Sequence, residues 1–305
     1  MRILITGASG LLGLNLALEA INTHDVVGVD RCQLINAPFE QVCTDLMEKG
    51  ALESVLDKVQ PEWLIHCAAM ANVEDCETNP GLARNLNASL PGDLASACKI
   101  RGVKMVHIST DSVFDGSKSD LYTEEDVPNP LNMYAKTKLQ GEQAVISINP
   151  SAIVARVNFF GFSVSGTRSI AEFFINNLNA GKRIKGFTDL MFNPTFVGDL
   201  ASLLLQMLAM DLSGLYHAAS GDVMSKYAFG VLLARRFGWD ESLISPESVE
   251  DSGLTARRAL NLGLSVQKLL TALGEPMPDF STGLDRLYTQ FHQGYPQKIR
   301  SYQYA

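Results

Sequence analysis

The chain has 305 residues, of which 46% are hydrophobic and 19% charged, as in an ordinary soluble globular protein that buries a large core. Its net charge of −8 at pH 7 disfavours a general surface for nucleic acid or an anionic membrane. No signal peptide precedes the first apolar run, and no apolar stretch is long enough to span a bilayer. The five cysteines form no C-x-x-C pair, so we expect a cytoplasmic protein with reduced, buried thiols and no metal site.

The chain opens on a short apolar run, Ile3–Ile5, which a glycine-rich turn follows at once. A turn of this kind between a strand and a helix brings backbone N–H groups to a pyrophosphate at the helix N-terminus. Gly7 permits the tight turn, Gly10 the close approach, and Gly13 the packing of helix on strand. The spacing, G-x-x-G-x-x-G, differs from the commoner G-x-G-x-x-G.

The second apolar run, Val26–Val29, ends in Asp30, close to the offset of about 20 residues at which an acid binds a ribose. Such an acid binds the ribose hydroxyls and repels a 2′-phosphate, so the sequence favours NAD(H). Arg31 beside it suits a 2′-phosphate, and NADP(H) stays open as the alternative. The alternative is an ordinary βα turn that happens to contain glycines. The acid at the end of the second run is not expected for such a turn, so we predict a βαβ dinucleotide-binding unit.

Apolar runs alternate with helical patterns through the first half of the chain. Continuous apolar runs are typical of strands buried on both faces of a parallel sheet, and successive βα units connect by right-handed crossovers. We therefore predict an α/β fold on a doubly wound parallel sheet, whose ligands bind beyond the carboxyl ends of the strands. The further predicted strands are Trp63–Cys67, Met105–Ile108 and Ala152–Ala155, and the helices are Ala51–Val59 and Ala83–Cys98, the latter interrupted by Pro91.

The second half of the chain is less regular. After a Gly- and Ser-rich loop, helices are predicted over Ile170–Leu178 and Val197–Met210, and Leu215–Ala218 returns as a strand of the main sheet. We expect residues 1–160, with returning segments near 190–220, to form the dinucleotide-binding domain. Residues 161–305 would form most of a smaller, mixed substrate-binding lobe.

Three residues at the ligand edge of the predicted sheet carry the chemistry of carbonyl–alcohol conversion. Tyr134 and Lys138 lie four apart on a predicted helix and share a face. An ammonium beside a phenol lowers the phenol pKa and prepares it for proton transfer. The hydroxyl of Thr110, at the end of a predicted strand, would orient the same carbonyl oxygen. A surface Tyr–Lys contact and a turn-forming Thr are the alternatives, but the common edge favours a site.

On these motifs the chain resembles an extended short-chain dehydrogenase/reductase, in the branch of the dTDP-4-dehydrorhamnose reductases and related sugar-nucleotide-binding proteins. The resemblance implies a Rossmann fold, a nicotinamide cofactor and a triad of Thr110, Tyr134 and Lys138. It also implies hydride transfer to the carbonyl of a 4-keto sugar nucleotide, as in dTDP-rhamnose biosynthesis. The matching stretches are ILITGASGLLG (residues 3–13), LIHCAAMANVEDCE (64–77), VHISTDSVFDG (106–116) and PLNMYAKTKLQGE (130–142), with a weaker match over 215–238.

The same resemblance implies where the ligands would bind. Lys138 would also bond the nicotinamide ribose, and Asn87 matches a structural or proton-relay asparagine. The implied cofactor residues are Gly7, Ser9, Gly10, Leu11 and Gly13 at the phosphates, Asp30 and Arg31 at the ribose, Asp45 and Leu46 at the adenine, and Ala68, Ala69, Tyr134 and Lys138 towards the nicotinamide. The implied substrate residues are Thr110, Asp111, Ser112 and Phe159.

Departures from the family pattern bear on substrate and assembly. Ser112 stands where the rhamnose reductases usually have tyrosine, and Phe159 where they usually have tryptophan, so the sugar is expected to differ. Asn15 replaces a glutamate that helps some members to hold magnesium between subunits, which argues against that dimer but leaves another homodimer open. Candidates for a substrate diphosphate, or simply exposed charges, are Lys182, Arg183, Lys185, Arg257 and Arg258, whereas His66, His107 and His217 are interpreted as structural.

Three other functions remain open at this point. An epimerase uses the same triad with a retained NAD, since fold alone does not decide function. A sugar-nucleotide 4,6-dehydratase is disfavoured, because Ser112 stands where its glutamate base should be. The regulatory beta subunit of methionine adenosyltransferase resembles the same branch, so the chain would then bind NADP(H) and a partner protein without turnover.

Overall fold

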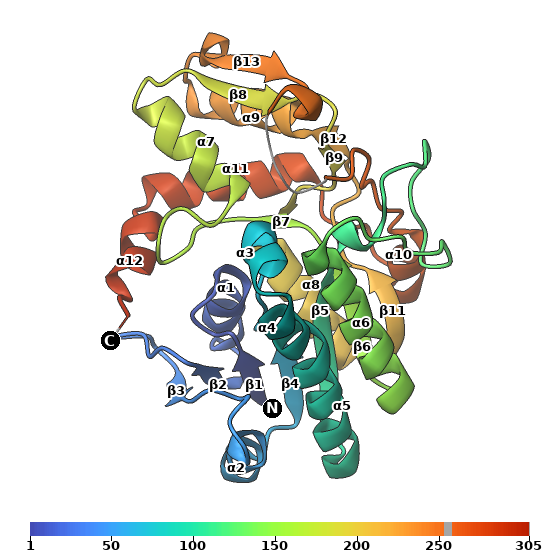
Figure 1. Ribbon diagram of the computed structural model, residues 1–305. Coiled ribbons are helices and arrows are strands. Elements are labelled where there is room, and N and C mark those ends of the chain that lie inside the picture. Colours follow the sequence, from blue (N-terminus) through green and yellow to red (C-terminus); the bar gives the residue numbers. More distant parts are fainter. Residues whose placement is uncertain (253–257, 305) are drawn as a thin grey trace.

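The computed structural model describes residues 1–252 and 258–304 and is built on one seven-stranded sheet (Figure 1). Every neighbouring pair of strands in this sheet is parallel. The chain starts inside the sheet and adds strands on both sides of β1. In spatial order the strands are β11 (Gly214–His217), β6 (Ile153–Val157), β5 (Lys104–Thr110), β4 (Trp63–His66), β1 (Arg2–Thr6), β2 (Asp25–Asp30) and β3 (Glu40–Cys43).

The predicted doubly wound parallel sheet is confirmed. Each apolar run that predicted a strand overlaps one of these strands, because a run without alternation can be buried on both faces. In β1, Ile3 and Leu4 point to opposite faces and are both almost fully buried. The strand order reverses direction on either side of β1, so β1 and its neighbour β4 form a switch point at which open α/β sheets bind ligands.

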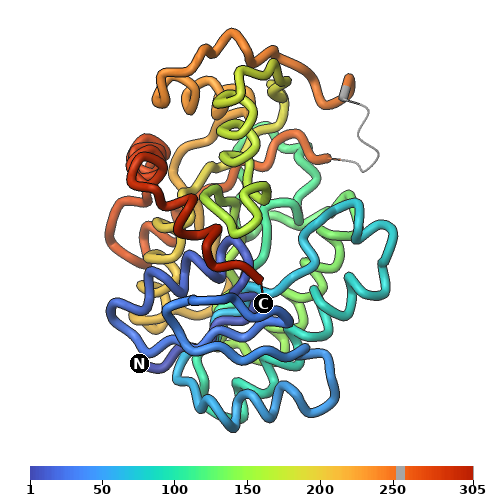
Figure 2. Tube along the Cα trace, turned by 90° about the vertical axis from the view of Figure 1, so that its left-hand side faces the viewer, coloured from blue at the N-terminus to red at the C-terminus, as the bar shows by residue number. Residues whose placement is uncertain are grey.

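Helices cover both faces of the sheet (Figures 1 and 2). On one face, Leu12 and Leu204 pack in the same layer as Ile3. On the other face, Leu94 packs in the same layer as Leu4. The helices of the first face are α1 (Leu11–Ala20) and α8 (Val197–Ala209), and those of the second are α2 (Ala51–Val59), α5 (Leu90–Arg101) and α6 (Met133–Ile148).

A π-helical turn, Asn85–Ser89, lies within the helix predicted over Ala83–Cys98, between α4 (Pro80–Arg84) and α5. Pro91 lacks the N–H that would bond the Asn87 carbonyl in a regular α-helix, so the ladder is broken there. A Cβ on Gly141 of α6 would lie 2.2 Å from that carbonyl oxygen. Glycine therefore lets α6 pack directly against the π turn.

A smaller mixed lobe lies beyond the carboxyl ends of the strands (Figure 1). Its core is aromatic: Phe229 contacts Phe160 and Phe280 with ring centroids 5.2 and 5.4 Å apart. We propose a domain boundary near residue 160. Two later segments, α8 and β11, return to the sheet and so belong with the first domain. The other elements are β7 (Phe159–Phe160), α7 (Ile170–Asn179), β8 (Ile184–Phe187), β9 (Met191–Phe192), β10 (Thr195–Phe196), β12 (Met224–Ser225), α9 (Lys226–Phe237), β13 (Ile244–Glu247), α10 (Gln267–Leu273), α11 (Phe280–His292) and α12 (Tyr295–Ser301).

The last residues fold back onto the first strands, and we call residues 294–304 the C-terminal strap. Ile299 is fully buried in a cluster with Leu34, which lies in the loop after β2. The Ile35 N–H donates to the Gln303 carbonyl at 2.8 Å. Figure 2 shows the C-terminus beside the N-terminal strands. The strap therefore braces the loop that follows β2.

Two expectations from the sequence concern the thiols of the cysteines and the absence of a membrane-spanning stretch. All five thiols are free, but the expectation that they are buried is wrong for Cys32 and Cys43, which are exposed. Both lie at the edge of the sheet, in the loop after β2 and at the end of β3. Among the described residues, no helix is both long and apolar enough to cross a membrane.

Candidate functional site

The glycine turn joins β1 to α1 at the carboxyl edge of the sheet. Gly7 has a φ of +69°, and a Cβ there would lie 2.7 Å from the Ala68 backbone nitrogen. A Cβ on Gly13 would lie 2.2 Å from the Gly7 carbonyl oxygen, so a side chain at either position would force a shift. Gly10 is the N-cap of α1, and no side chain in the described part of the chain bonds the first-turn N–H groups. These groups are left for an anion such as a dinucleotide phosphate.

Asp30, at the end of β2, is held against this turn. Its Oδ2 accepts the Ser9 N–H at 3.0 Å and the Ser9 hydroxyl at 2.7 Å, and its Oδ1 accepts the Arg31 N–H at 2.8 Å. The Arg31 side chain is exposed and makes no ion pair within residues 1–252 and 258–304. The predicted acid and glycine turn thus meet, with a free guanidinium beside them.

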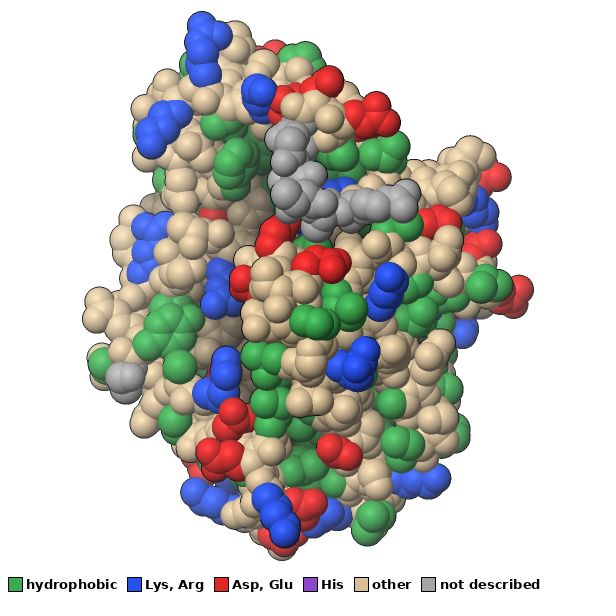
Figure 3. All heavy atoms as spheres, in the orientation of Figure 1, with side chains coloured by type: hydrophobic (Ala, Val, Ile, Leu, Met, Phe, Trp, Pro, Cys, Tyr) green, Lys and Arg blue, Asp and Glu red, His purple; other side chains and the backbone are tan. Residues whose placement is uncertain are grey.

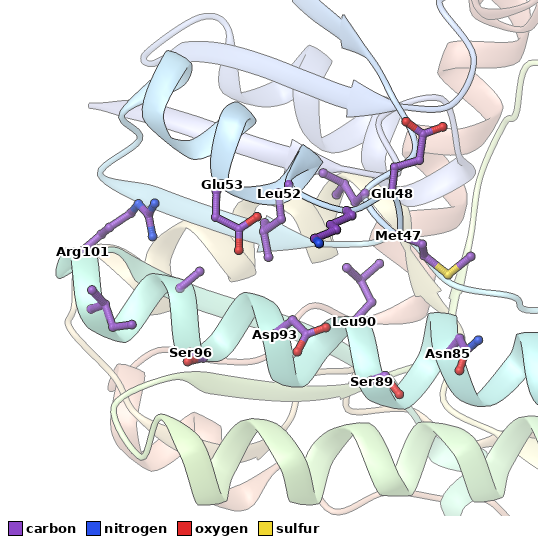
Figure 4. Close-up of a pocket in the computed structure, with 15 residues that line it drawn as sticks. Met47, Glu48, Leu52, Glu53, Asn85, Ser89, Leu90, Asp93, Ser96 and Arg101 are labelled. Carbon is purple, nitrogen blue, oxygen red and sulfur yellow. The ribbon is translucent and has the colours of Figure 1, made fainter.

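The other predicted cofactor residues follow β3 and β4 at the same edge. Asp45 and Leu46 come after β3, and Ala68 and Ala69 after β4. Leu46 also lines a cavity of about 690 Å³ between α2 and α5 (Figure 4). None of the residues of the glycine turn lines that cavity, so it is separate from the expected phosphate site.

Asn87, in the π turn, fixes the loop after β4. Its Oδ1 accepts the Met70 N–H at 2.9 Å, and its Nδ2 donates to the Met70 carbonyl at 3.0 Å. The same Nδ2 donates to the Thr137 hydroxyl of α6 at 3.1 Å. All these contacts position backbone and helix, which favours the structural role over the proton-relay role that the resemblance offered.

The structure brings Thr110 and Tyr134 together. Thr110 ends β5 and opens a 3₁₀ turn, Asp111–Val113, so its hydroxyl lies at the sheet edge. That hydroxyl donates to Asp111 Oδ1 at 3.0 Å and is within hydrogen-bonding reach of the Tyr134 phenol. Asn132 caps α6, which places Tyr134 in the first turn of the helix. A hydroxyl and a phenol on one spot can together hold and protonate a carbonyl oxygen.

The pKa of Tyr134 differs from the expectation. Burial raises it to about 12, the hydrogen bond with Thr110 lowers it in part, and the charge of Asp111 raises it further. The expectation of a lowered phenol pKa is therefore wrong, because burial outweighs the other effects on the phenol. Lys138 Nζ donates to the Ile108 carbonyl of β5 at 2.6 Å. The phenol is protonated at neutral pH.

Lys138 is buried beneath the phenol on the next turn of α6. Only 3% of the residue is exposed to solvent, as for the apolar residues of the core. Burial lowers the pKa of its ammonium to about 8, and the charge of Glu142 opposes that shift. The group therefore changes charge close to neutral pH.

A buried ion pair behind Lys138 ties α6 to the sheet. Glu142 Oε2 accepts from Arg156 Nη2 at 2.8 Å, with both side chains at most 3% exposed. The Ser109 hydroxyl donates to Glu142 Oε1 at 2.5 Å. Because Ser109 precedes Thr110, the pair holds the end of β5 in place. The sequence analysis missed it, although Glu142 ends one of the quoted motifs.

The three histidines interpreted as structural are buried. His66 and His107 stack with ring centroids 5.4 Å apart, and the Thr6 hydroxyl lies 2.6 Å from His66 Nδ1. Burial lowers the pKa of His66 and of His217 to about 3 and that of His107 well below its usual value. All three are neutral at physiological pH.

A small cavity of about 100 Å³ lies between the sheet edge and the smaller lobe. Ser112 and Asn158 line it from the sheet, and Lys226 and Arg258 from the lobe. In Figure 3 a hollow between the two lobes lies in the left half of the view, on the side of α1 and α7. The predicted substrate residue Phe159 does not line the cavity, because it packs against the apolar core as part of β7. The sequence analysis did not identify Lys226 as a residue of the site. The signal that could have pointed to it is a lysine directly after the helix cap Ser225.

Asp111 accepts three hydrogen bonds from its own neighbours. Its carboxylate accepts from Asn158 Nδ2 at 2.6 Å, from the Ser112 hydroxyl at 3.1 Å and from the Thr110 hydroxyl at 3.0 Å. Burial raises its pKa, and these hydrogen bonds oppose that shift. The carboxylate therefore orients the two hydroxyls that face the cavity and the phenol.

The remaining predicted residues are spread over the molecule. Asn15 is engaged within the chain: its Nδ2 donates to the Phe162 carbonyl at 2.9 Å, and its Oδ1 accepts from the Tyr295 phenol at 3.0 Å. Arg258 pairs with Glu74 at 2.6 Å. Lys182 and Arg183 are exposed before β8, Lys185 pairs with Glu247, and Arg257 lies outside the described residues.

Comparison with known proteins gives a consistent family. The model of the RmlD substrate binding domain family matches residues 1–293. A probable low-salt glycan biosynthesis reductase, Agl14, of Haloferax volcanii is 32% identical over 94% of this chain and 97% of its own length. Methionine adenosyltransferase 2 subunit beta of Mus musculus is 34% identical over 93% of this chain and 86% of its own. The dTDP-4-dehydrorhamnose reductase of Bacillus anthracis, solved with NADP, is 27% identical with a TM-score of 0.86, covering 95% of this chain and 99% of its own.

Proposed function

The chain belongs to the RmlD substrate binding domain family, and we propose that it reduces the carbonyl of a 4-keto sugar nucleotide with NAD(P)H. The observation that carries the proposal is the contact between the Thr110 hydroxyl and the Tyr134 phenol at the ligand edge of the sheet. The names of the Bacillus anthracis and Haloferax volcanii relatives support a reductase acting on sugars. The reduction step of dTDP-rhamnose biosynthesis is the nearest precedent for this reaction.

The residues around the glycine turn fit a dinucleotide. The turn has no room for a Cβ at Gly7 or Gly13, and the first N–H groups of α1 have no side-chain cap from the described residues. When bound, the nicotinamide supplies the hydride. We assign Gly7, Ser9, Gly10, Leu11 and Gly13 to the phosphates, Asp30 and Arg31 to the adenosine ribose, Asp45 and Leu46 to the adenine, and Ala68, Ala69, Tyr134 and Lys138 to the nicotinamide end.

Tyr134 is the proton donor in this proposal. Its pKa of about 12 keeps the phenol protonated at neutral pH, as reduction of a carbonyl requires. An alkoxide that forms on the substrate is more basic than this phenolate, so the proton passes from the phenol to the oxygen. Thr110 donates its one hydroxyl proton to Asp111 Oδ1 in this structure, and this proton would turn to the same substrate oxygen when the substrate binds.

Lys138 stabilises the phenolate that this proton transfer leaves. Its ammonium is anchored on the Ile108 carbonyl, one turn along α6 from Tyr134. A positive charge in such a dry place acts more strongly than it would in water. With a pKa of about 8, most of the lysine is charged at neutral pH.

Cofactor choice depends on Asp30 and Arg31. Asp30 already accepts three hydrogen bonds from the chain, two from Ser9 and one from Arg31, yet a carboxylate has room for one more. We expect it to accept a ribose hydroxyl and to favour NAD(H), with NADP(H) bound through the free Arg31 side chain. Dissociation constants for NADH and NADPH compare the two directly.

The test is the variant Tyr134→Phe, which removes one oxygen atom from the site. Consumption of the reduced cofactor with dTDP-4-dehydrorhamnose or a panel of keto-sugar nucleotides should fall by roughly 10²–10⁴-fold. Cofactor affinity should change far less, because Tyr134 is one of many residues that we assign to the cofactor. Tyr288→Phe is the matched control, because Tyr288 stacks on Arg236 of α9 on the smaller lobe. Turnover by Tyr134→Phe at the wild-type rate would contradict the proposal.

A regulatory subunit is the second candidate, favoured by the 34% identity to the mouse methionine adenosyltransferase subunit. Such a protein would bind NADP(H) tightly, consume none of it with any sugar nucleotide, and co-purify with a partner. An epimerase would interconvert sugar nucleotides without net loss of reduced cofactor. Consumption of reduced cofactor therefore separates the reductase from the other two functions, and analysis of the sugar-nucleotide products separates the epimerase from the regulatory subunit.

A further inference from the structure

Lys226 is a partly buried cation without a counter-ion in contact. It lines the small cavity, and its ammonium makes no hydrogen bond or ion pair with any residue of 1–252 or 258–304. Arg258 beside it is different, because its guanidinium is paired with Glu74. Burying a charge without a partner costs stability, and such groups concentrate where a ligand brings the partner.

The place of Lys226 in its helix adds to that cost. It is the first residue of α9, where the helix dipole favours negative charge and disfavours a cation. Helix formation does not need it, because Ser225 caps α9 by accepting the Ala228 N–H at 3.1 Å. A local structural role therefore does not explain a lysine at this position.

The cavity wall opposite Lys226 does not supply the missing partner either. Asp111 is the negative group that acts on Lys226, but no hydrogen bond or ion pair joins the two, and the carboxylate accepts instead from Asn158, Ser112 and Thr110. The cavity of about 100 Å³ holds one small substituent rather than a whole sugar. Ser112 lies two residues beyond Thr110, so the cavity adjoins the place of the substrate that Thr110 would hold.

We propose that Lys226 binds an anionic oxygen group of the substrate in this cavity and so selects for it. The group is a carboxylate carried by the sugar or an oxygen of the diphosphate. The inference rests on the proposed function, which it deepens by naming an anion as the feature that the smaller lobe recognises. An ammonium suits either group as a point charge, and the ion pair would be largely shielded from water.

Calorimetric titration of the full chain saturated with NADP⁺ tests this inference without any turnover. The probes are UDP, UDP-glucose and UDP-glucuronate, applied to wild type, Lys226→Met and Lys226→Arg. Lys58→Met, on exposed α2, is the matched control. We expect Lys226→Met to weaken binding at least about tenfold, Lys226→Arg to retain most of it, and the affinity for NADP⁺ to stay unchanged.

The pattern across the probes identifies the anion. A loss confined to UDP-glucuronate assigns Lys226 to a sugar carboxylate, and an equal loss for all three assigns it to the diphosphate. Unchanged affinity for every probe, or no binding of any probe to the wild type, overturns the inference. Binding that depends on Lys226 in a protein that consumes no NADPH would instead leave the anion site standing and remove the reductase.

Discussion

Burial acts in opposite directions on the two titrating groups of the candidate site. It raises the pKa of the Tyr134 phenol to about 12 and lowers that of the Lys138 ammonium to about 8. Both shifts favour the uncharged form, so the site at rest holds a protonated phenol above a lysine that is close to losing its proton. When the phenol gives up its proton, it becomes a negatively charged phenolate. The Lys138 ammonium then stabilises this phenolate.

The pH dependence of turnover follows from Lys138. Its ammonium is present below a pH of about 8 and is lost as the pH rises through that value, so kcat/KM for reduction should fall between about pH 7 and pH 9. Lys138→Met should lower the rate and flatten this limb. Initial rates across the range, with substrate well below saturation, measure it. A wild-type profile that stays level through pH 9 would contradict the role of Lys138.

The buried pair of Glu142 and Arg156 should matter more for stability than any exposed pair. Removing one partner leaves the other charge buried and alone, so Glu142→Gln should cost about 3–5 kcal/mol of unfolding free energy. Asp57→Asn breaks the exposed pair with Arg101 and should cost at most about 1 kcal/mol. Urea unfolding compares the two variants, and equal losses would refute this assignment.

The C-terminal strap lies beyond the residues that the family model matches. The match covers residues 1–293, and residues 294–304 bury Ile299 and pair with the loop after β2. That loop continues directly from Asp30 and Arg31, the residues that we assign to the adenosine ribose. Since loops held by few contacts open readily, the strap should stiffen the adenosine end of the cofactor site.

Releasing the strap should loosen the loop after β2 more than the rest of the sheet. Ile299→Asp places a charge in an apolar cluster, whereas Lys298→Asp changes an exposed residue of the same helix. Hydrogen exchange should accelerate over residues 31–39 in Ile299→Asp and not in Lys298→Asp, and the affinity for NADH should fall with it. Unchanged exchange over that loop would show that the strap does not brace it.

At the scale of the whole molecule, the site forms where two lobes meet at one edge of a sheet. The strands, the glycine turn and the meeting of Thr110 with Tyr134 follow from local patterns, because parallel strands end on a common edge. The pKa of Tyr134 could not be predicted, since burial depends on the whole fold. The places of Lys226 in the cavity and of the strap on the loop after β2 could not be predicted either, because each depends on residues far away in the chain.

A crystal structure of the protein with bound NADH or NADPH tests the central claim most directly. The account predicts the pyrophosphate on the Gly7–Gly13 turn, the adenosine ribose at Asp30, and the nicotinamide ring next to the Tyr134 phenol and the Lys138 ammonium. A dinucleotide bound elsewhere, for instance in the cavity between α2 and α5, or a nicotinamide ring remote from Tyr134, would contradict it.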